Sequence, residues 1–137
     1  MAIRVVRLGT PRHEDEGIRL GTVRRPPRGV RKADLGRRDY FDVWVPELAP
    51  SALLVSWALS EPFTSRRWAT FARRYRAEMR KPAAQRLIAL LAALSPRQDF
   101  SVGCYCADES RCHRSVLREL LQESGATLAE AWPTTRP

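Results

Sequence analysis

One segment limits the fold more than any other: residues 99–107, DFSVGCYCA, are apolar at nearly every position. Such a run is typical of a strand covered on both faces, whereas a half-exposed strand alternates apolar and polar residues. A helical pattern, RCHRSVLRELLQES, follows at 111–124, with Val116 and three leucines at helical spacing. The segment therefore predicts a central strand, a short loop and a helix.

The rest of the chain supplies further elements. Strands are predicted from β-branched or alternating residues at 2–8, 18–24 and 126–132. Helices are predicted from apolar residues at helical spacing at 49–60, at 65–79, and between Pro82 and Pro96. In the last of these, the leucines expected to face the core are Leu87, Leu90, Leu91 and Leu94. Ser51 is the expected N-cap of the first.

These elements predict the α/β class: a single layered domain over residues 1–137 that has a small sheet, mixed in direction, with flanking helices. Prolines, glycines and charges exclude regular structure from much of a long basic loop near 25–39, and residues 133–137 form a short tail. A loop of that length in a compact domain is typically functional or disordered.

The chain is strongly basic and its cysteines are few. The formal net charge is +9, and basic residues gather in 1–38 and 66–86. Such clustering favours anionic partners, although an arginine-rich coding bias on a solvated surface explains it equally well. Three cysteines, an odd number, argue against a secreted disulfide scaffold. Without an apolar run of about 18 residues or the apolar centre of a signal peptide, we expect a cytoplasmic protein with no membrane partner.

The strand–loop–helix junction at residues 106–114 is the predicted site. If the strand runs parallel to its neighbours, this loop lies where open α/β sheets bind ligands, next to the free N–H groups of a helix N-terminus. We expect a small anionic ligand there, nucleotide-like or phosphate-like. The residues expected to bind it are Arg24, Arg28, Cys106, Asp108 and Arg114.

Cys112 and His113 are the candidate catalytic residues. A helix N-terminus and neighbouring basic side chains lower the pKa of a thiol, which favours a thiolate nucleophile at Cys112. A plain structural cysteine is the alternative. The spacing argues against a cysteine phosphatase, whose arginine lies six residues after the cysteine, because the residue six after Cys106 is Cys112.

A metal ion at this junction would need Cys104, Cys106, Cys112 and His113 as its ligands. Their spacing matches none of the standard zinc patterns, which use pairs two to four residues apart. Cys104 and Cys106 are equally well explained as small core residues, because free cysteine is among the most buried residue types. The spacing therefore predicts no metal, and the sequence leaves the cofactor open.

Two other classes of function remain open. A nucleic-acid-binding module would use the arginines of 24–38 and 66–80, although no motif supports it and the aromatic residues of 68–75 have the spacing of a core. A partner protein with no chemistry of its own is the second alternative.

Four ordered blocks of the chain are GIRLGTVRRPPRGVRK (17–32), WVPELAPS (44–51), RWATFARRYRAEM (67–79) and CADESRCHRSVL (106–117). Together they resemble the YeaO-like branch of the domain-of-unknown-function family numbered 488. Where YeaO has Asp-Arg-Leu-Trp-Pro-Arg-Gly, this chain has Val23 for the aspartate and Pro26 for the tryptophan. The resemblance implies an α/β fold but no reaction. It also implies a shared site near Arg24, Arg28, Cys106, Cys112, His113 and Arg114.

Overall fold

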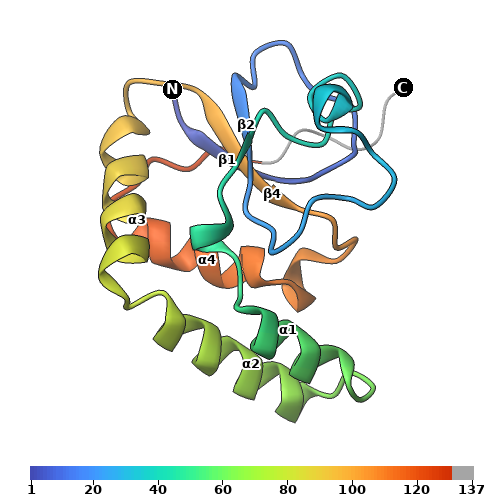
Figure 1. The fold of residues 1–137 in the computed structure, drawn as a ribbon. Coiled ribbons are helices and arrows are strands. Elements are labelled where there is room, and N and C mark those ends of the chain that lie inside the picture. The colour runs from blue at the N-terminus through green and yellow to red at the C-terminus, as the bar shows by residue number, and fades with distance from the viewer. Residues whose placement is uncertain (131–137) are drawn as a thin grey trace.

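A parallel sheet lies at the centre of the computed structural model, in which residues 1–130 are described (Figure 1). Its strands are β1 (Ile3–Arg7), β2 (Ile18–Gly21), β3 (Val43–Trp44) and β4 (Phe100–Cys104), in the order β1-β4-β2-β3. Every residue of β4 is buried, and the strand pairs with β1 on one side and β2 on the other. The predicted central strand and the α/β class are confirmed.

The direction of the sheet differs from the prediction, because all three strand pairs are parallel rather than mixed. Antiparallel neighbours can be joined by a tight hairpin, whereas parallel neighbours need a connection that crosses back over the sheet. Here each connection carries the chain back to the amino-terminal end of the sheet before the next strand begins. The carboxyl ends of β2 and β4 therefore meet at one edge.

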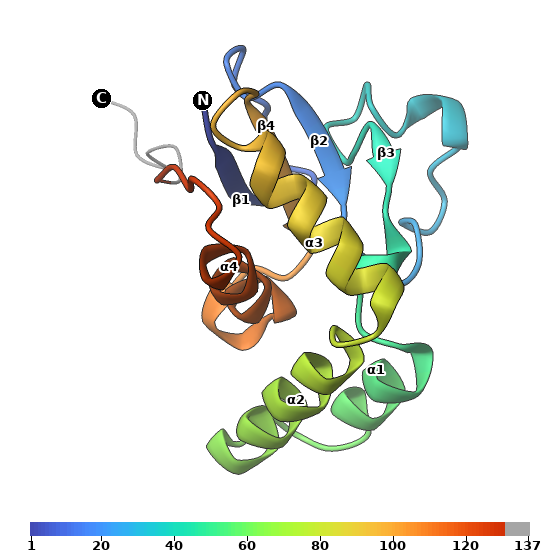
Figure 2. The same ribbon diagram turned by 90° about the vertical axis from the view of Figure 1, so that its left-hand side faces the viewer.

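Four helices complete the described fold: α1 (Ala52–Leu59), α2 (Ser65–Glu78), α3 (Pro82–Leu94) and α4 (His113–Glu123). Short 3-10 turns lie at η1 (Lys32–Asp34), η2 (Pro46–Leu48) and η3 (Glu109–Arg111). Ser51 caps α1 as predicted, since its side chain accepts a hydrogen bond from the Leu54 N–H at 3.2 Å. Figure 2 shows α1 and α2 as a pair beyond the edge toward which β2 points.

Helix α3 presents a different face from the one predicted. Leu91 is buried and Leu87 half-buried, but Leu90 and Leu94 are 53% and 41% exposed. The buried positions of this helix are Ala84, Ile88, Leu91 and Ala92. Two small alanines therefore let the helix pack closely on the core, and the exposed leucine pair, four residues apart, lies on another face of it.

The other departures lie at the edges of predicted elements. Strand β2 ends at Gly21 rather than at residue 24, and Ile18, expected on its apolar side, is exposed. The predicted strand at 126–132 is represented by one parallel bridge between Leu128 and Ile3, while residues 131 and 132 and the predicted tail 133–137 lie outside the described residues. The loop 25–39 is irregular as predicted, apart from η1, and Leu35 holds it on a small apolar cluster.

A buried ion pair that the sequence did not indicate holds the start of β2. Both oxygens of Glu16 accept from the Arg19 guanidinium, at 2.7 and 2.9 Å, and each residue is 1% exposed. Ser101 donates to the same carboxylate at 3.0 Å. Arg19 also donates to the backbone carbonyls of Thr10 and Asp39. Arg19 thus joins the loops before and after β2 to the central strand.

No helix in the described part of the chain is long and apolar enough to cross a membrane.

Candidate functional site

A cleft of about 740 Å³ opens between the α1–α2 pair and the β4–α4 junction. One wall is apolar and aromatic, formed by Trp57, Phe63, Trp68 and Phe71. The opposite wall carries Cys104, Cys106, Cys112 and His113. The cleft therefore lies at the carboxyl edge of the parallel sheet, where α/β proteins bind ligands.

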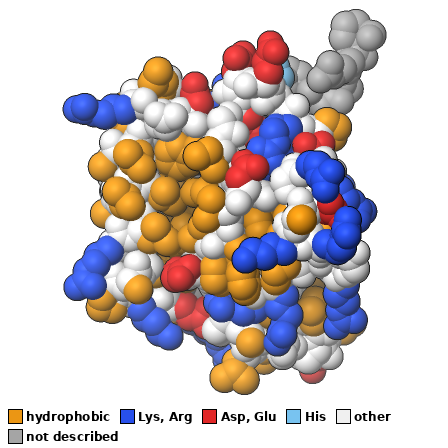
Figure 3. Space-filling view, turned by 45° about the horizontal axis from the view of Figure 1, so that its top comes forward, with side chains coloured by type: hydrophobic (Ala, Val, Ile, Leu, Met, Phe, Trp, Pro, Cys, Tyr) orange, Lys and Arg blue, Asp and Glu red, His pale blue; other side chains and the backbone are white. Residues whose placement is uncertain are grey.

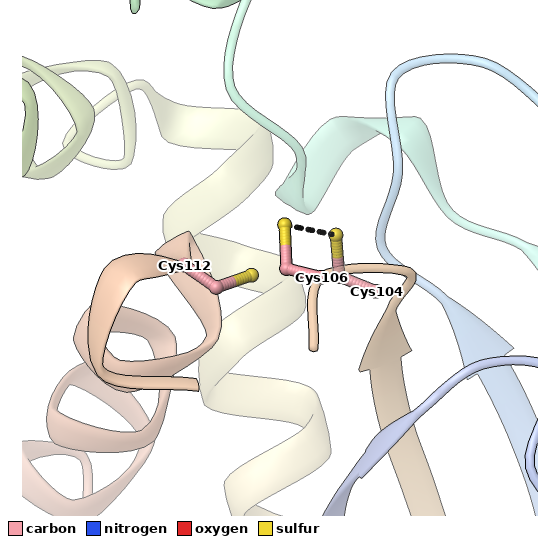
Figure 4. A group of neighbouring side chains, drawn as sticks. All are labelled: Cys104, Cys106 and Cys112. Atoms are coloured by element: carbon pink, nitrogen blue, oxygen red, sulfur yellow. Dashed lines mark hydrogen bonds between the residues drawn. The ribbon is translucent and has the colours of Figure 1, made fainter. Parts of the chain in front are cut away.

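The three cysteines of the chain converge at one point of this wall (Figure 4). Cys104 ends β4, Cys106 follows two residues later, and Cys112 is the N-cap residue of α4. The sulfurs of Cys104 and Cys106 are 3.8 Å apart, and all three sulfurs lie within 4.8 Å of one another. Cys104 and Cys112 are buried, whereas Cys106 is exposed. The cluster thus has one sulfur that a molecule in the cleft can reach.

Hydrogen bonds within the cluster lower the pKa of one thiol, Cys106, and raise the pKa of another, Cys104. Bonds from the Cys104 and Cys112 thiols lower the pKa of Cys106 to about 3, against the opposing effect of burial, and the charge of Arg114 acts in the same direction. The Cys104 thiol donates to the Cys106 sulfur, and this hydrogen bond, with burial, raises the pKa of Cys104. Cys106 is therefore the member of the cluster that carries negative charge first.

Cys112 and His113, the predicted catalytic pair, are in contact. The Nδ1 atom of His113 lies 3.7 Å from the Cys112 sulfur, and its Nε2 atom lies 2.6 Å from the backbone carbonyl oxygen of Thr22. A carbonyl oxygen only accepts, so Nε2 carries a hydrogen and donates it. In the neutral ring, Nδ1 is then an acceptor that faces the Cys112 thiol.

Arg114 lies behind the cluster rather than on the wall of the cleft. The residue is 3% exposed, and its Nη2 donates to the backbone carbonyl of Cys106 at 2.5 Å. Its Nε atom has no hydrogen-bond partner in the described structure, and no carboxylate there forms an ion pair with it. The guanidinium is therefore a buried positive charge, and it helps to lower the pKa of both the Cys106 thiol and the exposed Asp108 carboxylate.

The other predicted ligand-binding residues lie in different environments. Arg24 lines the cleft, but its guanidinium donates to the backbone carbonyls of Pro50, Pro46 and Ala49 at 2.8, 3.1 and 3.3 Å. Arg28 is exposed and is not part of the cleft wall. Asp108 is also exposed and caps η3, where it accepts from the Ser110 N–H at 3.0 Å and the Ser110 hydroxyl at 2.6 Å.

A second set of arginines lines the cleft instead. Arg25 lies on its rim with an exposed side chain. The Arg67 guanidinium lies 4.1 Å from the centre of the Trp57 ring, and that of Arg111 lies 4.3 Å from the centre of the Phe63 ring. Sequence reasoning missed this rim, because the spacing of Trp68 and Phe71 indicated a core face. Arg67 and Arg74 of α2 lie over Trp57 of α1 rather than over an aromatic residue of their own helix, so no local spacing signals this rim.

A protein-family model matches residues 3–125 of the chain; the family is DUF488-N3a, described as the active DUF488-N3 subclade. No curated protein and no solved structure matches the chain.

Proposed function

The chain belongs to the DUF488-N3a family, and we propose that it binds a small anionic ligand with a flat apolar group in the cleft beside the three cysteines. The family match extends the resemblance to DUF488 proteins over nearly the whole described chain. The family's description as an active subclade names no reaction, so the proposal draws on the site itself.

One observation carries this proposal: positive charge and aromatic surface meet in the same cleft. Arg25, Arg67 and Arg111 provide three guanidinium groups. Arg67 and Arg74 lie over the Trp57 ring and Arg111 lies over the Phe63 ring, while Trp68 and Phe71 add aromatic surface to the same cleft. Guanidinium groups bind carboxylates and phosphates through paired hydrogen bonds, whereas aromatic faces bind flat rings. A nucleotide-like molecule combines both features.

Arg25 is the strongest candidate for direct contact with the anionic group. No described residue forms a hydrogen bond or an ion pair with its guanidinium, whereas Arg67 donates to the Trp57 carbonyl and pairs with Glu61 at 3.0 Å. Arg111 lies 3.6 Å from the Asp108 carboxylate in a loose, exposed ion pair. Arg24, whose donors are already used by backbone carbonyls, shapes the cleft rather than binding the ligand.

Thiol chemistry on the bound ligand is a second candidate function, favoured by the 3.7 Å contact between the Cys112 sulfur and the His113 Nδ1. The imidazole can accept the thiol proton there because its Nε2 hydrogen is directed to Thr22. Cys106 lines the same cleft and is exposed, so it is a second candidate nucleophile beside the buried Cys112.

The nucleic-acid hypothesis has less support. In the basic segments, Arg31 and Arg37 both pair with Asp34, and Arg76 pairs with Glu119 and Glu123. Figure 3 shows one face of the molecule, on which basic side chains lie in separate groups around an apolar area, with acidic side chains between them. A continuous basic stripe, the usual footprint of a nucleic-acid site, does not appear on this face.

The test is a thermal-shift experiment with adenosine 5′-monophosphate, adenosine and inorganic phosphate as matched probes. A probe at 100 times its Kd should stabilise the folded protein by about 2.7 kcal/mol. We expect the monophosphate to bind best, and Arg25→Ala to weaken it by about tenfold, equivalent to about 1.4 kcal/mol. Arg28→Ala, in the same loop but outside the cleft wall, is the matched control.

Two results would count against the proposal. Stabilisation lost in Arg28→Ala but kept in Arg25→Ala would place the anion elsewhere. The absence of stabilisation by all three probes, together with oligonucleotide binding that falls steeply with salt, would favour the nucleic-acid hypothesis instead.

A further inference from the structure

We infer that Cys104, Cys106 and Cys112 form a binding site for a zinc ion, with three thiolate ligands and one coordination position facing the cleft. The inference does not depend on anion binding in the cleft. It departs from the expectation drawn from the spacing, because folding brings together cysteines whose order in the chain resembles no standard zinc pattern.

The first support is the distance between the sulfurs. Zinc–sulfur bonds of about 2.3 Å in a tetrahedral site separate two sulfurs by about 3.8 Å. The sulfurs of Cys104 and Cys106 already have this separation, 3.8 Å. The Cys112 sulfur lies within 4.8 Å of both, so it needs to approach by no more than about 1 Å.

The second support is the charge around the cluster. Three thiolates and one divalent zinc ion carry a net charge of −1. Arg114 is 3% exposed and forms no ion pair with a described carboxylate, and it contacts the loop through the Cys106 carbonyl. A buried guanidinium requires a compensating negative charge, and an anionic zinc–thiolate group beside it supplies one.

The third support is that the loop carrying the sulfurs is held in place. Arg118 on α4 forms a bidentate ion pair with Glu109, with distances of 2.8 and 2.9 Å. Asp108 caps the η3 turn, and Arg114 holds the Cys106 carbonyl. These contacts fix the turn between Cys106 and Cys112, so the loop is preorganised and loses little conformational freedom when a metal binds.

His113 is an outer partner of the ion rather than its fourth ligand. Its Nε2 donates to the Thr22 carbonyl and its Nδ1 faces the Cys112 sulfur, so both ring nitrogens already have a partner and neither is left to bind the ion. Its Nδ1 contact with the Cys112 sulfur helps to orient that ligand, as residues outside the first coordination shell commonly do. With three protein ligands, the fourth position is open to the cleft, as in catalytic zinc sites.

The experiment uses the full chain, reduced and stripped of metal, with its three thiols confirmed by titration under denaturing conditions. Zinc uptake is measured by competition with a chromophoric chelator. Cadmium then serves as a spectroscopic probe, because its thiolate charge-transfer absorption grows with the number of bound sulfurs. We expect one zinc ion per chain and a cadmium absorption corresponding to three thiolates.

Cys106→Ser is the decisive variant, because Cys106 is exposed and its replacement leaves the core intact. We expect it to lose more zinc affinity than the roughly 10- to 100-fold typical of an outer-shell change, with the cadmium absorption falling to two thiolates. Ser56→Ala, an exposed position on α1 that lines the cleft away from the cysteine loop, is the control and should retain three. Zinc binding unchanged in Cys106→Ser, or no zinc uptake by the reduced wild-type chain, would overturn the inference.

Discussion

The guanidinium of Arg114 donates a hydrogen bond to the backbone carbonyl of Cys106, eight residues earlier in the chain. The arginine expected from the sequence to bind an anion therefore holds the loop that presents the exposed sulfur. We expect its effect on a ligand in the cleft to be indirect, through the position and the charge of the cysteine cluster.

Arg114→Ala is expected to destabilise the protein more than to weaken binding at the rim of the cleft. Losing a buried hydrogen bond from a charged group costs about 1.5–3 kcal/mol. Chemical denaturation measures this loss, with Arg111→Ala, a change at an exposed pair, as the control at about 0–1 kcal/mol. A stable Arg114→Ala protein that no longer binds the monophosphate would instead place Arg114 in the ligand site.

The Glu16–Arg19 pair gives a second prediction. Glu16→Gln leaves the Arg19 guanidinium buried without its counter-charge, which typically costs about 3–5 kcal/mol. Glu123→Gln removes one partner of the exposed Arg76 pair and should cost no more than about 1 kcal/mol. Equal free energies of unfolding for the two variants would show that the buried pair contributes little.

The same pair predicts how stability depends on pH. Burial raises the pKa of Glu16, but the hydrogen bonds and charge of Arg19 outweigh it, and the net shift lowers the pKa below its usual value of 4.5. A group whose folded pKa is lowered stabilises the protein above its unfolded pKa, and this contribution is lost as the pH falls through the folded value. We expect the free energy of unfolding to fall on acidification below about pH 5.

Glu16→Gln removes this titration, so its unfolding free energy should depend less on pH in the acidic range than that of the wild type. Asp42, whose pKa is also lowered, against burial, by hydrogen bonds from Arg12 and the Arg19 N–H, remains in both proteins. Identical slopes in denaturation curves recorded from pH 6 to about pH 3 would contradict the prediction.

Exposure predicts the order in which the cysteines react. In the reduced, metal-free protein, iodoacetamide should modify Cys106 first, because Cys104 and Cys112 are buried. Peptide mass spectrometry after short exposure identifies the modified residue. Zinc should slow the reaction at Cys106 if the three sulfurs bind it. Modification of Cys112 as fast as Cys106 would show that the cluster opens in solution.

Much of the fold could be predicted from the sequence because local patterns encode it. The apolar run of β4, the helical spacing of α2 and α4, and the Ser51 cap each depend on neighbours in the chain. Whether neighbouring strands run parallel or antiparallel depends instead on the end of the sheet to which each connection returns the chain. The inward face of α3 depends on close packing by alanines, which carry little hydrophobic signal of their own.

The ligand site expected at the junction 106–114 stays a prediction. The junction does border the cleft, because both lie at the carboxyl ends of the parallel strands. The assembly of three sulfurs from Cys-x-Cys and a helix cap was not predictable from spacing, because zinc patterns describe local pairs. Of the arginine rim, Arg111 lies within the junction, whereas Arg25 follows β2 and Arg67 lies on α2; only tertiary structure brings these two to the same cleft as the cysteines.

The position of β4 between β1 and β2 has a consequence for the order of folding. The first two strands are each hydrogen-bonded to β4 and not to each other, although they precede it by about eighty residues or more. During synthesis, they have no partner at the centre of the sheet until residue 104 has been made. Contacts between residues so distant in sequence slow folding, so the sheet, the cleft and the cysteine cluster should form together, only after β4 and the start of α4 have been made.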